Sequence, residues 1–277
     1  MPGLEAAALR GVDLDLAYHG DVVVHGANLE LRRGEVTALV GPNGSGKSTL
    51  LRALARLHGP ARGGVRLDDS ADALALSRRE FARRVTLLAQ SRPTPAGISV
   101  RDVVGFGRHP YRGRWRAADP EGPAVVAHAL RLTGVEQLAD RSVEELSGGQ
   151  LQRVWVASCL AQQTGVLLLD EPTTHLDLRY QVELLDLVRD LADHQQVAVG
   201  LVLHDLDQAA SVADVLVLLD SGRVRAVGPP AEVLTSELLS ETYGIRVEVD
   251  ADPVTGALRT RAVGRHALRP VGAAGRN

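Results

Sequence analysis

One nine-residue segment constrains the fold of this chain more than any other feature. It matches the pattern G-x-x-x-x-G-K-[ST] and consists of Gly41, Pro42, Asn43, Gly44, Ser45, Gly46, Lys47, Ser48 and Thr49. An apolar run, Val36–Val40, precedes it, and a pattern with helical spacing follows as far as His58. Four leucines share one face of that pattern: Leu50, Leu51, Leu54 and Leu57. A strand, a glycine-rich loop and a helix in this order predict a βα unit of an α/β fold.

The residue types of this loop suit phosphate binding. Glycines let successive backbone N–H groups turn inward around an anion, and the following helix adds the positive end of its dipole. Lys47 is expected to reach the β- and γ-phosphates, Ser48 to ligate Mg²⁺, and Thr49 to contact the α-phosphate. The loop therefore predicts that the chain binds a nucleoside triphosphate.

Lys47 is also the only lysine among 31 basic residues. A codon bias toward arginine would explain the excess of arginine by itself. The exception nevertheless lies where a compact ammonium group suits the space between phosphate oxygens better than a planar guanidinium group does. We therefore expect arginine to be a poor substitute at this position.

Composition excludes several classes of protein. A chain of 277 residues with 45% hydrophobic and 23% charged residues is typical of soluble globular proteins. No apolar run approaches the roughly 20 residues of a membrane span, and the N-terminus has no signal-peptide pattern. Cys159, the single cysteine, cannot form an intrachain disulfide and is expected to be a small buried residue. The net charge of −3 gives no reason to expect nucleic acid as a partner.

The pattern along the chain predicts an α/β core with a helical insertion. Short apolar runs typical of buried parallel strands occur at Val166–Leu169, Val197–Leu203 and Val215–Leu219, the last continuing into a hairpin. Residues 91–165 contain helical stretches and no convincing long strand. We expect a nucleotide-binding domain over 1–250, with its core at 1–90 and 166–250 and a helical subdomain at 91–165. Residues 251–277 are expected to form a flexible C-terminal extension.

Two further motifs, taken together with the phosphate loop, indicate one particular family of nucleotide-binding proteins. Leu146-Ser147-Gly148-Gly149-Gln150 opens a predicted helix, and the strand Leu167–Leu169 runs into Asp170-Glu171. Ser147 alone could be a helix N-cap before a glycine turn. Together and in this order, the three motifs resemble the ATP-binding-cassette (ABC) ATPases over about residues 10–250. The resemblance implies a P-loop ABC cassette with a RecA-like core, an N-terminal antiparallel β part and an inserted helical subdomain.

The resemblance also implies roles for individual residues. Tyr18 is similar to the aromatic residue that stacks on adenine, although a half-buried strand tyrosine is the alternative. Gln90 resembles the glutamine that contacts Mg²⁺ and the attacking water, and Asp170 is expected to hold Mg²⁺. Glu171 is the expected general base, and His204 resembles the switch histidine near the γ-phosphate. The remaining nucleotide contacts implied are those of Ser147, Gly148, Gly149, Gln150 and Asp177.

In that family the residues of one cassette cover only one side of the γ-phosphate. The signature motif of a second cassette covers the other side. The implied assembly is an ATP-sandwich homodimer on polytopic permease subunits, at the cytoplasmic side of the membrane. An extracytoplasmic substrate-binding protein would be an indirect partner. Three local sequences, over 107–115, 170–188 and 238–256, resemble cassettes that import ferric siderophores, haem or vitamin B12.

Alternatives remain at this point. The arginines around Tyr111 and Trp115 have three interpretations. The resemblance implies a region near the groove that receives the permease, and the others are a solvated loop and a nucleic-acid surface. The favoured function is ATP-driven import of a ferric siderophore or related iron chelate. A cassette for haem or cobalamin is the alternative within the family, and a soluble ABC ATPase acting on nucleic acid or the ribosome is the alternative from another class.

Overall fold

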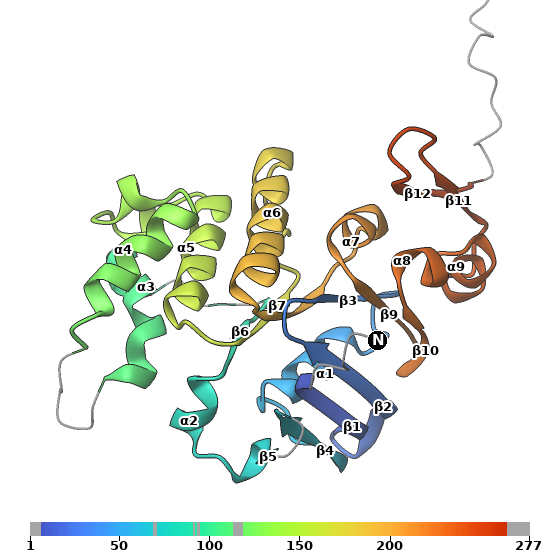
Figure 1. Ribbon diagram of the computed structural model, residues 1–277, viewed down its shortest axis with the longest axis horizontal. Helices are drawn as coiled ribbons and strands as arrows, with labels where there is room; N and C mark the ends of the chain where they lie inside the picture. The colour runs from blue at the N-terminus through green and yellow to red at the C-terminus, as the bar shows by residue number, and fades with distance from the viewer. Residues whose placement is uncertain (1–6, 69–70, 91, 93–94, 113–118, 265–277) are drawn as a thin grey trace, which may run out of the picture.

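The computed structural model describes residues 7–68, 71–90, 92, 95–112 and 119–264 (Figure 1). Its strands are β1 (Ala7–Tyr18), β2 (Asp21–Arg32), β3 (Val36–Val40), β4 (Arg62–Leu67), β5 (Ala71–Asp72), β6 (Val85–Leu88), β7 (Val166–Asp170), β8 (Ala198–Val202), β9 (Val215–Asp220), β10 (Arg223–Gly228), β11 (Val247–Ala251) and β12 (Leu258–Ala262). Its α-helices are α1 (Lys47–Leu54), α2 (Arg78–Ala82), α3 (Val100–Gly105), α4 (Gly122–Leu132), α5 (Gly148–Ala161), α6 (Leu178–Gln195), α7 (Leu206–Val212), α8 (Pro230–Val233) and α9 (Ser236–Tyr243). Short 3₁₀ segments are η1 (Ala73–Ala75), η2 (Phe106–Tyr111), η3 (Glu136–Leu138) and η4 (Val143–Glu145).

A six-stranded sheet forms the centre of the molecule, in the order β10-β9-β3-β8-β7-β6. All of its pairs are parallel except β9 with β10, which form the predicted antiparallel hairpin. Strands β3, β7 and β8 are buried at every residue, which explains their uninterrupted apolar sequences. Because the strands are parallel, the loops after β3, β6, β7 and β8 all emerge at one edge of the sheet.

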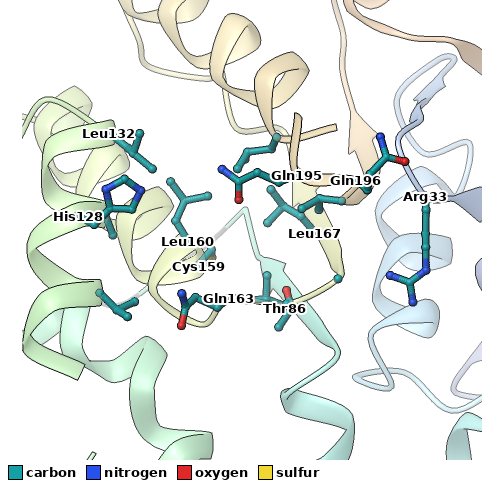
Figure 2. A pocket seen from close by; sticks show the side chains of 16 residues that line it. Arg33, Thr86, His128, Leu132, Cys159, Leu160, Gln163, Leu167, Gln195 and Gln196 are labelled. Atoms are coloured by element: carbon teal, nitrogen blue, oxygen red, sulfur yellow. The ribbon is translucent and has the colours of Figure 1, made fainter. Parts of the chain in front are cut away.

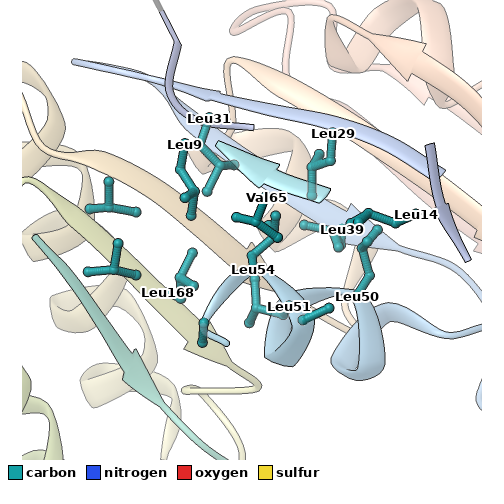
Figure 3. Packing of buried hydrophobic residues seen from close by; sticks show 14 of the residues in the cluster. Leu9, Leu14, Leu29, Leu31, Leu39, Leu50, Leu51, Leu54, Val65 and Leu168 are labelled. Carbon is teal, nitrogen blue, oxygen red and sulfur yellow. The ribbon is translucent and has the colours of Figure 1, made fainter. Parts of the chain in front are cut away.

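The second sheet is antiparallel, in the order β2-β1-β4-β5, and it packs with α1 against one face of the central sheet. The side chains of this core come from all three elements (Figure 3). Leu9 and Leu31 belong to the antiparallel sheet, Leu51 and Leu54 to α1, and Leu168 to the central sheet, and none is exposed. The antiparallel β part and the RecA-like core that the resemblance implies are both present, which confirms the predicted fold class.

Helices α3, α4 and α5 form a group beside the central sheet, with an apolar core of their own that includes Val103, Leu130 and Val154 (Figure 1). Helix α5 begins with a capping box. The Ser147 hydroxyl accepts from Gln150 N, and the Gln150 side chain accepts from Ser147 N. The described residues between 91 and 165 contain no strand, as the sequence predicts.

Helix α1 ends earlier than its apolar pattern predicts. It stops at Leu54, and Leu57, which was expected on the buried face, is 69% exposed. Arg56 takes a left-handed φ of 59°, and Leu57 N donates to Arg52 O at 2.9 Å. This is the Schellman arrangement that terminates a helix, here with arginine where glycine is more common. Periodicity alone does not reveal this stop.

The expectation of a flexible extension from residue 251 is wrong for its first part. Strand β12 pairs antiparallel with β11 over five residues, from Val247 opposite Ala262 to Ala251 opposite Leu258. Asp252 stabilises the turn, since its carboxylate accepts from the backbone N–H groups of Val254 and Thr255. Residues 265–277, the rest of the predicted tail, lie outside the described residues.

Candidate nucleotide-binding site

A cavity of about 580 Å³ lies at the sheet edge where the loops after β3, β6, β7 and β8 emerge. Many predicted site residues line it: Tyr18, Asn43, Gly44, Gly46, Lys47, Ser48, Thr49, Gln90, Glu171 and His204. Lys47, Gln90, Glu171 and His204 share one cavity because the parallel strands before them end together. Tyr18 joins them from the end of β1 in the antiparallel sheet.

The phosphate loop is folded around the side chain of Lys47. Its Nζ donates to Gly41 O and to Pro42 O, both at 2.8 Å, and the residue is 5% exposed. Burial lowers the pKa of Lys47, while the negative charges of Glu171 and Asp170 oppose this decrease. Gly41 has a φ of 138°, and a Cβ there would lie 2.0 Å from Leu219 O. Only glycine fits where β3 turns into the loop.

Asp170 lies at the end of β7 beneath the cavity and is fully buried. The Ser48 hydroxyl donates to its Oδ1 at 2.6 Å, and Arg52 Nη2 lies 3.4 Å from its Oδ2. Burial raises the pKa of Asp170, and the Ser48 hydrogen bond and the Arg52 charge counter that increase. Two of the three predicted Mg²⁺ ligands, Ser48 and Asp170, are therefore adjacent.

Glu171 is held at both carboxylate oxygens. Gln90 Nε2 donates to Oε2 at 2.7 Å, and His204 Nε2 lies 2.6 Å from Oε1. The Glu171 side chain is 11% exposed, and its backbone adopts a left-handed φ of 53°, which is unusual for a residue other than glycine. Its N–H donates to Val202 O at 3.2 Å and fixes this turn after β7. The carboxylate thus lies in the same cavity as Lys47.

Tyr18 lies at the cavity's other side and is 39% exposed. Its ring packs on that of His58, with centroids 4.4 Å apart and a tilt of 34°. One face of the tyrosine is thus supported from within the chain, and Tyr18 lies in β1 with part of its surface in the cavity. Stacking of adenine on Tyr18 stays a prediction.

The signature residues Ser147–Gln150 and Asp177 do not line this cavity. Ser147 and Gln150 cap α5, and Asp177 caps α6 by accepting from Tyr180 N at 3.1 Å. The two caps are neighbours, because a Cβ on Gly149 would lie 3.5 Å from His175 O. Within one chain, the predicted nucleotide contacts of these residues are not brought to the phosphate loop.

Comparison with known proteins now identifies the family. The family model for the ABC transporter matches residues 24–174, more than half of the chain, and spans the phosphate loop, the signature and Asp170-Glu171. The chain belongs to the ABC transporter family. It is an ATPase of that family. Among its structural neighbours is a dimeric structure of the ATP-binding cassette MJ0796 in a post-hydrolysis state, bound to ADP and Pi. The identity is 25% and the TM-score 0.72, and the match covers 80% of this chain and 98% of that chain.

Relatives of this ABC cassette include importer subunits. The ferric enterobactin transport ATP-binding protein FepC of Escherichia coli (strain K12) is 44% identical over 94% of this chain and 96% of its own length. The hemin import ATP-binding protein HmuV of Rhodococcus jostii (strain RHA1) is 43% identical over 91% and 85%. Among solved structures, an inward-facing metal-chelate type ABC transporter has a TM-score of 0.79 and 28% identity, with 93% of this chain and 97% of that chain covered.

The structure removes one arginine from the surface predicted for the arginine-rich segment of the cassette. Arg108 is 2% exposed and is neither solvated nor available to a nucleic acid. It pairs with Asp119 at 2.7 Å, donates to Gln163 Oε1 at 2.7 Å, and stacks 3.9 Å from the Tyr111 ring. Residues 113–118, with Arg114, Trp115 and Arg116, lie outside the described residues.

Sequence reasoning missed several residues that support the site. Arg52 reaches Asp170, and His58 reaches Tyr18. Gln152 Nε2 donates to Pro172 O at 2.7 Å, and its Oε1 accepts from Arg92 Nη2 at 2.9 Å. Helix α5, which begins with the signature motif, is thereby joined to Arg92 close to Gln90 and to Pro172 beside Glu171. Arg52 had a detectable signal, since it lies one helical turn after Ser48.

A second cavity, of about 370 Å³, lies among α4, α5, β7 and the end of α6 (Figure 2). None of the predicted nucleotide-site residues lines it. Cys159 does, and it is 9% exposed, which confirms the expected buried cysteine. Burial raises the pKa of its thiol to about 11. The cassette's only cysteine is therefore protonated and unreactive at neutral pH.

Proposed function

We propose that this chain is the ATP-hydrolysing subunit of an importer for a ferric siderophore or a related iron chelate. The Glu171 carboxylate, held at both oxygens in the cavity that contains Lys47, carries the proposal for hydrolysis. The identity to FepC over nearly the whole of both chains supports the cargo. The proposed domain organisation is a core over 1–90 and 166–250 with a helical subdomain over 91–165.

In the proposed mechanism, ATP enters the cavity with adenine on Tyr18 and the phosphates in the loop. Lys47 exchanges its contacts with the loop carbonyls for the β- and γ-phosphate oxygens. Glu171 accepts a proton from the water that attacks the γ-phosphate, while Gln90 and His204 hold the carboxylate toward that water. Positioning and charge neutralisation supply most of the rate enhancement in phosphoryl transfer.

The residues present also suit Mg²⁺. A hydroxyl and a carboxylate, from Ser48 and Asp170, lie 2.6 Å apart beside the phosphate loop, and oxygen donors are the ligands that Mg²⁺ prefers. We propose that both residues hold the ion together with the nucleotide, with Gln90 as a further ligand. The ion would neutralise charge on the β- and γ-phosphates.

We further propose that the working unit is a homodimer. Ser147, Gly148, Gly149, Gln150 and Asp177 lie away from the cavity of their own chain, and the α5 N-terminus can offer backbone N–H groups to a phosphate. A second copy would receive them at its γ-phosphate. The dimeric form of a related cassette in its post-hydrolysis state supports this arrangement.

The permease is proposed to bind a second surface. A cavity of about 650 Å³ between the end of α1, α2 and β6 is bordered by Leu57 and Leu74, which are 69% and 49% exposed. Leu57 and Leu74 expose apolar surface beside this cavity, and a bound protein would remove that surface from water. No helix in the described part of the chain is long and apolar enough to cross a membrane. The cassette would therefore reach the cytoplasmic side of the membrane through permease subunits, with a substrate-binding protein as an indirect partner.

Deletion of the gene and measurement of labelled uptake test the proposed cargo. We expect uptake of ferric siderophores to be lost, to return with the wild-type gene and to stay absent with a Glu171→Gln copy, because import needs ATP turnover. Uptake of haem and cobalamin is expected to be unchanged. Loss of haem uptake alone would favour the alternative that HmuV suggests, and loss of cobalamin uptake alone would favour a cobalamin cassette. Unchanged uptake of every cargo would contradict the importer proposal.

A further inference from the structure

The carboxyl-terminal hairpin of β11 and β12 is attached to α7, the helix that follows His204 (Figure 1). The backbone N–H and the hydroxyl of Thr260 both donate to Asp207 Oδ1, at 2.7 and 2.8 Å. Leu258 of β12 packs against the same apolar cluster as Leu206 of α7. One carboxylate oxygen therefore receives two hydrogen bonds from the hairpin, each strengthened by the negative charge.

The other strand of the hairpin is attached to α9. Val247 N donates to Ser240 Oγ, and Val249 N donates to Ser236 Oγ, both at 2.9 Å. The hairpin thus bridges two helices of the core. Because α9 fixes one side of the hairpin, the contacts of Thr260 restrain α7 on the other side.

Helix α7 is in turn joined to the nucleotide site. It has seven residues, Asp205 caps it, and His204 comes directly before that cap. On α7, Gln208 Nε2 donates to Gln181 Oε1 at 2.8 Å, and Gln181 Nε2 donates to Leu176 O at 3.1 Å. A helix of two turns has little stability by itself, so its placement depends on such contacts.

We propose that the β11–β12 hairpin holds α7, and through it His204, in the position required for ATP turnover. Asp207 and Thr260 are positioning residues in this device, and the inference rests on the proposed role of His204. The hairpin contributes no lining residue to the nucleotide cavity and acts through His204, which contacts the proposed base Glu171 at 2.6 Å. We therefore expect an effect on turnover and not on ATP affinity.

The test compares Asp207→Ala with Asp207→Asn in the full chain, with Asp250→Ala on the exposed part of β11 as the matched control. Hydrogen–deuterium exchange is followed over residues 204–212 and over 41–49. Loss of two hydrogen bonds predicts about tenfold faster exchange at 204–212 and about tenfold lower kcat in Asp207→Ala. We expect KM for ATP and exchange over 41–49 to stay unchanged. Asp207→Asn keeps an acceptor oxygen and is expected to retain most of the turnover, and Asp250→Ala to match the wild type.

A double variant separates this device from general destabilisation. In a His204→Ala background, Asp207→Ala is expected to cause no further loss of the residual rate. Unchanged exchange over 204–212, or an equal rate loss with and without His204, would overturn the proposal. A wild-type chain without ATP turnover would instead refute the proposed function, and the exchange data would still report whether the hairpin restrains α7.

Discussion

At the residue scale, the decisive group is the single lysine. Lys47 Nζ is buried and donates to two loop carbonyls at 2.8 Å, a position that suits a compact cation. A guanidinium group is wider and planar. We expect Lys47→Arg to lower kcat/KM for ATP by about 100-fold or more, because the charge is kept but its donor no longer lies where the phosphate oxygens need it. Steady-state ATPase assays check this, with Arg33→Lys on the surface as control. Turnover near the wild-type rate would refute this account of Lys47.

Also at this scale, Gly41 decides whether the phosphate loop can form. Gly41→Ala would place a Cβ 2.0 Å from Leu219 O at a φ of 138°, and we expect a loss of about 3 kcal/mol in the free energy of unfolding. Gly44 has a φ of 77°, but a Cβ added there would meet no heavy atom within 4 Å. Gly44→Ala should therefore cost only about 1 kcal/mol. Urea unfolding of both variants measures the difference, and equal losses would mean that the backbone clash is relieved.

At the element scale, Arg108 anchors η2 to the end of α5. Its pairing with Asp119 and its bond to Gln163 are buried. Arg108→Ala is expected to cost about 2–3 kcal/mol, because the Asp119 carboxylate, which is 10% exposed, loses its ion-pair partner. Arg101→Ala removes a pair with Asp140 that is 50% and 88% exposed, and should cost less than about 1 kcal/mol. Thermal unfolding distinguishes the two. A nucleic-acid role for Arg108 would predict the reverse, with binding lost and stability kept.

At the scale of the whole molecule, one chain has a complete phosphate loop and a signature motif that faces elsewhere. Glu171→Gln keeps the shape of the side chain but removes the proposed base. We expect this variant to bind ATP and Mg²⁺, to form a dimer that light scattering detects, and not to hydrolyse the nucleotide. Ser147→Arg in the same chain should prevent dimerisation, since the signature would no longer approach a phosphate. A Glu171→Gln chain that stays monomeric with saturating nucleotide would contradict the sandwich arrangement.

The sequence by itself determined the central α/β fold, the phosphate loop and most of the residues around the nucleotide cavity. These features depend on local patterns. Glycine spacing sets the loop, and uninterrupted apolar runs mark strands that are buried on both faces. Gln90 and His204 were assigned through family resemblance, because no local property of a single glutamine or histidine indicates a site.

Only the tertiary structure decided how distant residues meet. Periodicity predicted α1 to include Leu57, but the left-handed Arg56 ends the helix and exposes that leucine. The composition of residues 251–277 suggested a flexible tail, but β12 gains strand pairing, apolar packing and the bonds to Asp207. The sequence suggested that Arg108 is a surface cation, but its side chain is buried with that of Asp119. In each case the contacts that decide the outcome join residues far apart in sequence, and their free energy exists only once the chain has folded.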